Sequence, residues 1–199
     1  MLKNRVATLG TMADLHAHAA GYSLQTLARL VGEGSPDLLC LEITREAWEA
    51  ESLGAAALPI RAALAPLAER SDIVVLPVAV RPREHSDHAP RAGARALLVN
   101  GLERLHRAVQ WRAGARTING AVYGAFCHTV CALQEAGWPP EARAAWQGET
   151  TAMLAITLNA LRNDPGRRTL LVTQCQRKHW LDDRLRREAD VELTDYWRL

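Results

Sequence analysis

The sequence predicts an α/β fold in which a central, mostly parallel sheet of about five strands is flanked by helices. Two short continuous apolar runs, at residues 38–43 and 169–173, are typical of parallel strands that are buried on both faces. Stretches with apolar side chains at helical spacing separate these and the other predicted strands. This alternation, with no internal repeat and no linker, predicts a single domain over residues 1–199.

Three strands and three helices are predicted in the first half of the chain. The strands are expected at residues 5–11, 38–43 and 72–80, and the helices at 23–32, 45–52 and 58–70. Ser23 is a favoured N-cap residue for the first helix. Pro66 interrupts the third helix, which predicts a kink or a break. Pro77 removes one hydrogen-bond donor from the third strand, so this strand is expected to bulge or to lie near an edge of the sheet.

The second half of the chain begins with a helical middle segment and ends in two further strands. Its elements are predicted as helices at residues 95–113, 118–136 and 141–162, a strand at 169–173, a helix at 180–189 and a strand at 191–197. The middle helices would cover a face of the sheet or build a wall over its ligand-binding edge. The last strand is less continuously apolar than the two apolar runs, and its apolar and polar residues do not alternate cleanly. It is therefore expected at an edge of the sheet or as an antiparallel member.

Composition and charge exclude several classes of protein. The chain of 199 residues carries a net charge of +2, which is too small to predict binding to nucleic acid or to a membrane surface. No signal peptide and no membrane-spanning stretch are expected. The four cysteines form no C-x-x-C pair, so neither a zinc ribbon nor a redox motif is indicated, and reduced thiols in the cytoplasm are expected. The sequence leaves the oligomeric state open, a homo-oligomer included.

Polar and titratable side chains follow four of the predicted strands. The loops carry His16 and His18, then Glu42, then residues 81–88, and then residues 174–179. If the strands are parallel, these loops gather at one edge of the sheet, where open α/β sheets bind their ligands. This edge is the predicted functional site.

Several of these residues also have a structural explanation. His16 and His18 are spaced to ligate a metal ion from an extended segment, but solvated loop histidines explain them equally well. Glu42 ends an apolar strand, where a carboxylate is costly unless it is paired or hydrated, so a functional role is favoured. The loop at residues 84–88 is rich in potential ligands, although an exposed polar loop is the favoured interpretation.

The cysteines of the second half are interpreted mainly as core residues. Cys127 and Cys131 lie four residues apart on an apolar helix, where packing is favoured over a site. Cys175 follows a predicted strand and precedes Arg177 and Lys178, whose positive charge could lower the pKa of its thiol. The sequence does not identify a base that would activate Cys175, so a nucleophilic role for this cysteine is a minor alternative.

Two segments of the chain resemble a known family. Residues 6–42 contain a strand, a turn after Gly10, a helix, a Pro-Asp pair and a strand that ends in Glu42. Residues 151–193 contain a helix with an early methionine, a strand, a turn, a second helix and a final strand. These segments resemble the opening and closing halves of the TraB, Tiki and ChaN-like group, which is related to the erythromycin esterases. In that group both turns read Gly-x-x-His, and in Tiki-like proteins the two histidines are associated with a divalent metal and with peptide hydrolysis.

The chain departs from the family pattern in both turns. Gly10 and Glu42 match, but Ala13 stands where the first histidine is expected, and Gln174 and Arg177 stand where the second motif has glycine and histidine. Alanine cannot ligate a metal and arginine would repel one, so the resemblance implies that the family's metal site is absent. No cofactor and no tightly bound transition metal are therefore predicted, and a divalent metal is disfavoured.

Two functions follow from these residues. The first is a hydrolase of esterase or peptidase type, acting on a small molecule or a peptide. In it His16 or His18 activates a water, Glu42 orients the base or takes the proton, and Arg177 stabilises a developing oxyanion. His179 lies close to the lost motif positions, as do the other two histidines, and all three are candidate replacements for the missing ligands.

The alternative function is a non-catalytic binding or regulatory protein that retains the fold and holds a carboxylate or a phosphate. Besides Arg177, its candidate ligand-binding residues are Arg81, Arg83, His85, Gln174 and Glu149. Haem is a further ligand that the resemblance to ChaN-like proteins suggests, but no residue matches a haem-ligand motif. A buried Arg177 needs a partner, and the candidates are Glu42, Glu149 or a bound anion.

Overall fold

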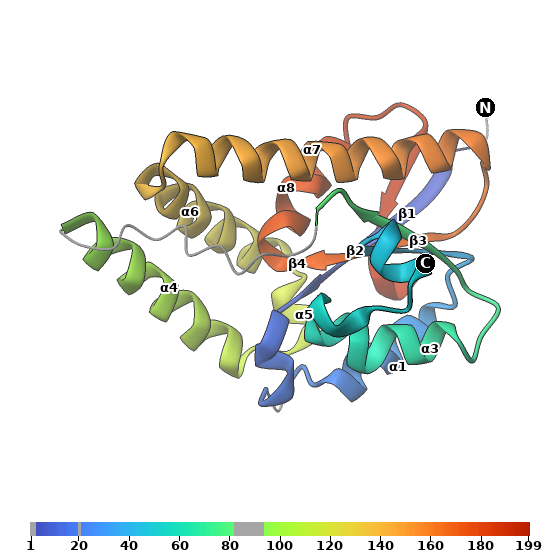
Figure 1. Cartoon of the computed structure of the whole chain (residues 1–199), viewed down its shortest axis with the longest axis horizontal. Helices are drawn as coiled ribbons and strands as arrows, with labels where there is room; N and C mark the ends of the chain where they lie inside the picture. The colour runs from blue at the N-terminus through green and yellow to red at the C-terminus, as the bar shows by residue number, and fades with distance from the viewer. Residues whose placement is uncertain (1–2, 20, 82–93) are drawn as a thin grey trace.

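The computed structural model describes residues 3–19, 21–81 and 94–199, and within these residues five parallel strands form one sheet (Figure 1). The strands are β1 (Asn4–Thr11), β2 (Leu38–Thr44), β3 (Val74–Ala79), β4 (Thr169–Gln174) and β5 (Val191–Thr194). Their order across the sheet is β3-β2-β4-β1-β5. The predicted α/β fold is confirmed, and every strand pairing is parallel.

The late strand β4 lies between β1 and β2, the first two strands of the chain. Its register places Thr11 opposite Gln174, and β2 pairs with it from Leu38 to Leu41. Both β2 and β4 are interior and almost entirely buried, as their continuous apolar runs predict. The strand ends Thr11, Thr44 and Gln174 consequently lie at one edge of the sheet, which we call the carboxyl edge.

Helices cover both faces of the sheet, because side chains alternate along each strand. Leu39 and Leu41 of β2 face one buried cluster, and Leu38 and Cys40 face the other. Helices that contribute to the first cluster are α1 (Leu24–Gly34) and the π-helical segment η3 (Ile60–Leu64), which continues into α3 (Ala65–Ala68). Helices that contribute to the second are α7 (Pro140–Asn163) and α8 (Cys175–Leu185). Figure 1 shows α7 crossing the sheet on the side opposite α1 and α3.

The helical middle segment stands beside the carboxyl edge rather than on a face of the sheet. It consists of α4 (Ala94–Arg112), α5 (Ala115–Ile118) and α6 (Ala121–Gly137). The side chain of Asn119, between α5 and α6, accepts a hydrogen bond of 2.6 Å from the backbone N–H of Gly10 near the end of β1. Of the two predicted arrangements, the wall at the ligand-binding edge is therefore the one observed.

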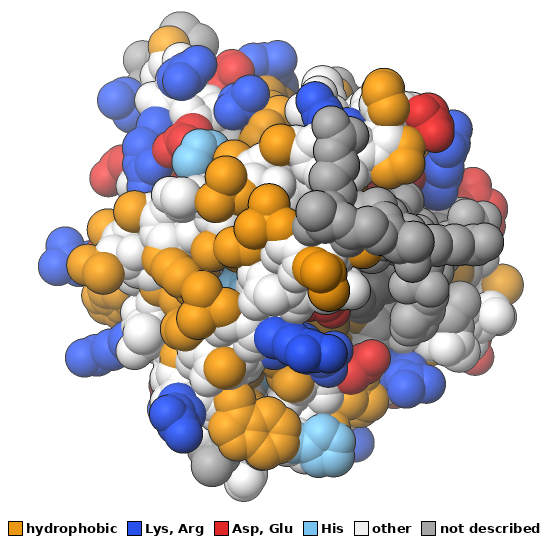
Figure 2. Space-filling model, turned by 90° about the vertical axis from the view of Figure 1, so that its left-hand side faces the viewer, with side chains coloured by type: hydrophobic (Ala, Val, Ile, Leu, Met, Phe, Trp, Pro, Cys, Tyr) orange, Lys and Arg blue, Asp and Glu red, His pale blue; other side chains and the backbone are white. Residues whose placement is uncertain are grey.

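The outer side of this wall is rich in apolar side chains. Exposed hydrophobic residues of α4 and α6 include Leu97, Leu98, Leu105 and Val122. Figure 2 views the molecule from this side and shows hydrophobic side chains gathered there between scattered basic ones. In the part of the chain that the structure describes, no helix is both long enough and apolar enough to span a bilayer.

Of three local predictions from the sequence, those for Ser23 and Pro77 are confirmed, and the break at Pro66 is not observed. Ser23 caps α1 by accepting a hydrogen bond of 3.2 Å from the backbone N–H of Thr26. The helix that contains Pro66 changes from π to α form next to this proline but continues through it without the expected break. Pro77 lies in the edge strand β3, whose pairing with β2 shifts register after Leu41.

The start of α8 is predicted wrongly. The sequence suggests a polar turn at residues 174–178 and a helix from Trp180, but α8 begins at Cys175. No glycine or proline interrupts this stretch, and Lys178 and Asp182 form a buried ion pair of 2.6 Å along the helix. The residues that follow β4 are therefore held in a helical turn and not in a loop.

Two other boundaries differ from the prediction. The helix expected at residues 118–136 is divided between α5 and α6, because Asn119 and Gly120 leave the helical conformation. The last strand, β5, ends at Thr194 and is followed by the short turn η4 (Tyr196–Arg198). It is a parallel edge strand, so the expectation of an edge is confirmed and the antiparallel alternative is wrong. The remaining short helical turns are η1 (Ala13–Ala17), α2 (Arg45–Glu49) and η2 (Leu53–Ala55).

Candidate functional site

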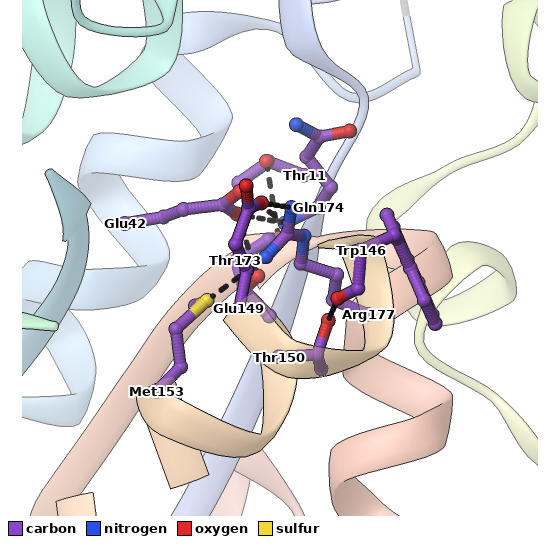
Figure 3. A network of polar contacts seen from close by, with 9 residues as sticks. All are labelled: Thr11, Glu42, Trp146, Glu149, Thr150, Met153, Thr173, Gln174 and Arg177. Carbon is purple, nitrogen blue, oxygen red and sulfur yellow. Dashed lines mark hydrogen bonds and ion pairs between the residues drawn. The ribbon is translucent and has the colours of Figure 1, made fainter. Parts of the chain in front are cut away.

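The carboxyl edge brings together four of the residues predicted from the sequence: Glu42, Arg177, Glu149 and Gln174 (Figure 3). One carboxylate oxygen of Glu42 accepts hydrogen bonds from the Thr173 hydroxyl at 2.7 Å and from the Gln174 backbone N–H at 3.1 Å. Its other oxygen lies 3.4 Å from Nε of Arg177. The Glu42 side chain is only 12% exposed, and these three donors replace the water that it loses on burial.

Arg177 lies in the first turn of α8, and its guanidinium is held from several sides. Nε faces Glu42, and Nη2 donates a hydrogen bond of 2.9 Å to Glu149 of α7. Nη1 lies 3.3 Å from the sulfur of Met153, and the guanidinium carbon lies 5.7 Å from the centroid of the Trp146 ring. Both carboxylates that the sequence offers as partners therefore bind Arg177, and one positive group faces two negative ones.

The two carboxylates differ in how firmly they are held. Glu42 is anchored to β4 through Thr173 and Gln174 as well as to Arg177. Glu149 is 29% exposed, and the described residues give its carboxylate one hydrogen bond, from Arg177. The inner carboxylate is therefore a fixed part of the edge, whereas the outer one is held, among the described residues, by Arg177 alone.

His16 is held by the backbone of its own loop. It is 1% exposed, its Nε2 accepts a hydrogen bond of 2.8 Å from the Met12 N–H, and its Nδ1 lies 2.7 Å from the Tyr22 carbonyl, to which it donates. Burial lowers the pKa of His16, so the neutral ring is favoured. Both nitrogens are occupied, and the histidine fixes the turn that follows β1 instead of offering a base to the carboxyl edge.

The other two predicted histidines also lack contacts with Glu42 and Arg177 among the described residues. His18 is exposed and stacks against Trp111, with ring centroids 6.2 Å apart. His179 packs so closely on Gly124 that a Cβ at this glycine would lie 2.8 Å from its Nδ1. Burial lowers the pKa of His179, and its Nε2 is buried without a hydrogen-bond partner in the described part of the chain.

The remaining candidates have different outcomes. Gln174 contributes its backbone N–H to Glu42, and its side chain is partly exposed at the carboxyl edge. Arg81 is exposed after β3. Arg83 and His85 lie outside the described residues. The carboxyl edge is therefore built from Glu42, Arg177, Glu149 and Gln174, without the three histidines.

Stability should decrease in mild acid because of His16. The pKa of His16 in the folded protein is lowered below 6.5, so in mild acid the unfolded chain binds a proton more readily than the folded chain does. The free energy of unfolding should therefore fall as the pH drops from about 7.5 to about 5.5, and less so in His16→Asn. Urea unfolding at both pH values tests this, with His18→Asn as the exposed control. An unchanged slope in His16→Asn would contradict the assignment.

A second group of polar and thiol side chains lies behind the carboxyl edge, where the sequence did not place a site. Cys175, the first residue of α8, is 2% exposed, and its Sγ accepts a hydrogen bond of 3.0 Å from the Gln110 amide. The Tyr123 hydroxyl lies 3.8 Å from this sulfur and 2.6 Å from Nε2 of His106. Cys127 of α6 completes the group, since its sulfur lies within 4.8 Å of the ligand atoms of Cys175 and His106. We call these five residues the thiol cluster.

The neighbours of Cys175 in the thiol cluster shift the pKa of its thiol. A hydrogen bond from the Cys127 thiol, with further help from His106, lowers the pKa of Cys175 well below its ordinary value although burial opposes this. The sequence does contain one signal for the cluster. His106 and Gln110 lie four residues apart on the buried face of an otherwise leucine-rich helix, where polar side chains need partners.

The resemblance to the TraB, Tiki and ChaN-like group stays a prediction. Gly10 and Glu42 occupy the positions it assigns to them, at the carboxyl ends of β1 and β2. A comparison with known proteins found no match for this chain among family models, curated proteins or solved structures.

Proposed function

We propose that the protein binds a small anionic ligand at the carboxyl edge, with Arg177 as the anchor of the ligand. The observation that carries this proposal is the unequal hold on the two carboxylates around Arg177. Glu42 is fixed by β4, whereas Glu149 is held in the described residues by Arg177 alone. A ligand carboxylate or phosphate can therefore take the place of Glu149 without disturbing the sheet.

The geometry of Arg177 suits this exchange. Its Nε edge is occupied by Glu42, which orients the planar guanidinium, and its Nη2 points toward the more exposed Glu149. A bound anion would receive charge-assisted hydrogen bonds from this outer side. The Trp146 ring, 5.7 Å from the guanidinium carbon, borders the same place and offers an apolar contact.

Hydrolysis is the less well supported alternative. It needs a base that can reach a bound water, and His16, the buried candidate, has both ring nitrogens bound to the backbone. His18 is exposed, stacks on Trp111 and has no contact with Glu42 or Arg177 among the described residues. Glu42 is the remaining candidate base, but its carboxylate already accepts hydrogen bonds from Thr173 and Gln174. A hydrolase would therefore have to break contacts that a binding protein can keep.

The Glu149→Gln variant should bind anions more tightly than the unaltered chain. The change removes the competing charge and leaves Glu42 to orient Arg177, so the affinity for phosphate, pyrophosphate or succinate should rise by roughly tenfold. Calorimetric titration and the shift of the unfolding temperature with each anion measure this. Glu141→Gln is the matched control, because Glu141 is an exposed glutamate on the same helix.

Arg177→Lys should abolish this anion response while changing thermal stability little without ligand. Lysine keeps the positive charge but lacks the planar fork. If Arg177→Lys lowers stability strongly, and Glu149→Gln responds to anions no more than Glu141→Gln does, Arg177 is a structural ion pair and the proposed function is wrong. Ester or peptide hydrolysis by the purified protein that is lost in Glu42→Gln would favour the hydrolase instead.

A further inference from the structure

We propose that the thiol cluster is a binding site for a soft divalent cation of the Zn²⁺ class, with His106, Cys127 and Cys175 as its ligands. The ligand atoms of these three residues all lie within 4.8 Å of one another, and all three side chains are buried. The site is separate from the carboxyl-edge positions Ala13 and Arg177. The prediction of no metal from the sequence rested on those two positions and not on the cysteines.

Three different helices supply the ligands. His106 belongs to α4, Cys127 to α6 and Cys175 to the start of α8, and they are exposed by 2%, 0% and 2%. Packing alone would fill such a junction with aliphatic side chains. Two thiols and an imidazole that converge there instead are the donor set that zinc prefers.

The charge balance also suits a buried ion. Two thiolates and one neutral imidazole neutralise a divalent cation, so the occupied site would carry no net charge in an apolar environment. The start of α8 at Cys175 also favours a negative sulfur, because a helix N-terminus stabilises negative charge.

A small rearrangement brings the ligands to coordination distance. Zinc bonds of about 2.3 Å to sulfur and about 2.0 Å to nitrogen place tetrahedral ligand atoms roughly 3.5 Å apart, so the three atoms, now within 4.8 Å of one another, need to close by up to about 1.3 Å. In the structure the Tyr123 hydroxyl bridges His106 and Cys175, at 2.6 and 3.8 Å. The ion would take the place of this bridge. Tyr123 also lines a hollow of 470 Å³ that is formed mainly by α5 and α6.

Cys131 provides a matched control. It lies one helical turn after Cys127 on α6, with the two sulfur atoms 3.9 Å apart, but it is outside the group of three whose ligand atoms converge. Cys131→Ser therefore makes the same chemical change as Cys127→Ser at a neighbouring position. Comparison of metal binding by Cys131→Ser and Cys127→Ser distinguishes a defined site from a general affinity of thiols for metal.

The test is a titration of the full chain with Co²⁺ and then Zn²⁺, after chelation and under a metal-compatible reductant. We expect one ion per chain, with sulfur-to-cobalt charge-transfer absorption and the intense visible bands of tetrahedral cobalt, which Zn²⁺ then displaces. His106→Ala, Cys127→Ser and Cys175→Ser should each weaken binding by at least about tenfold, and Cys131→Ser should bind like the unaltered chain. Zn²⁺ should also raise the unfolding temperature.

Several results would overturn the proposal. One is a cobalt spectrum without sulfur charge transfer, and another is much less than one ion bound per chain. A third is equal binding by the unaltered chain and by Cys127→Ser or Cys175→Ser. Circular dichroism of each variant without metal shows whether it is folded, and the spectrum of the unaltered chain decides the question if a variant is not.

Discussion

Asp182→Ala is expected to destabilise the fold by about 3–5 kcal/mol. Asp182 is 4% exposed and pairs with the buried ammonium of Lys178 at 2.6 Å, and the Thr8 hydroxyl of β1 donates a hydrogen bond to its second oxygen. Alanine would leave a charged lysine buried between α8 and the sheet without its counterion. Urea unfolding at neutral pH measures the loss directly.

Two further variants separate the buried charge from other effects. Asp183→Ala removes the neighbouring carboxylate, which is exposed and pairs with Arg186, and it should change stability by less than about 1 kcal/mol. Adding Lys178→Met to Asp182→Ala should recover much of the loss, because no unpaired charge is then buried. If Asp182→Ala is as mild as Asp183→Ala, the ion pair is not a determinant of stability.

Gly10→Ala should also destabilise the protein, by about 1–3 kcal/mol. An added Cβ would lie 3.0 Å from Cδ of Lys178 and 3.1 Å from the backbone Cα of Cys175. The lysine side chain can give way, but the backbone of α8 can only move away from β1. Thermal and urea unfolding should both detect the change.

The sign of the stability change in Gly10→Ala distinguishes a steric clash with α8 from the general effect of replacing a flexible glycine. Gly101 lies within α4, and a Cβ there would meet no other atom within 4 Å, so Gly101→Ala should stabilise the protein by up to about 1 kcal/mol through helix propensity. Stabilisation by both substitutions would show that the close approach of α8 to β1 is not required. Because Cys175 moves with α8, Gly10→Ala should also weaken metal binding at the thiol cluster.

Much of the sheet could be predicted from the sequence, because burial leaves a simple pattern. The continuous apolar runs at residues 38–43 and 169–173 belong to β2 and β4, which are interior strands. Parallel strands then place Glu42 and Arg177 at one edge, and a buried charge needs a partner, so their contact follows from the same reasoning.

The other features of the candidate site depend on tertiary contacts that cannot be read from the spacing of residues in the sequence. The sequence shows that His16 follows a strand, but not that the Met12 N–H and the Tyr22 carbonyl occupy its ring. The thiol cluster requires knowledge of which faces of α4, α6 and α8 meet. The wrong start of α8 also moved Cys175 into a loop, away from the helix junction at which it is buried.

The position of β4 has a consequence for synthesis of the chain. β1 and β2 leave the ribosome early, yet they do not pair with each other, because β4 is inserted between them in the finished sheet. The nascent chain must therefore keep the apolar strands β1 and β2 apart until β4 has been synthesised. Such long-range pairing slows folding and exposes strand edges to other chains, so we expect the sheet to form only after β4 has been synthesised and its formation to benefit from chaperones.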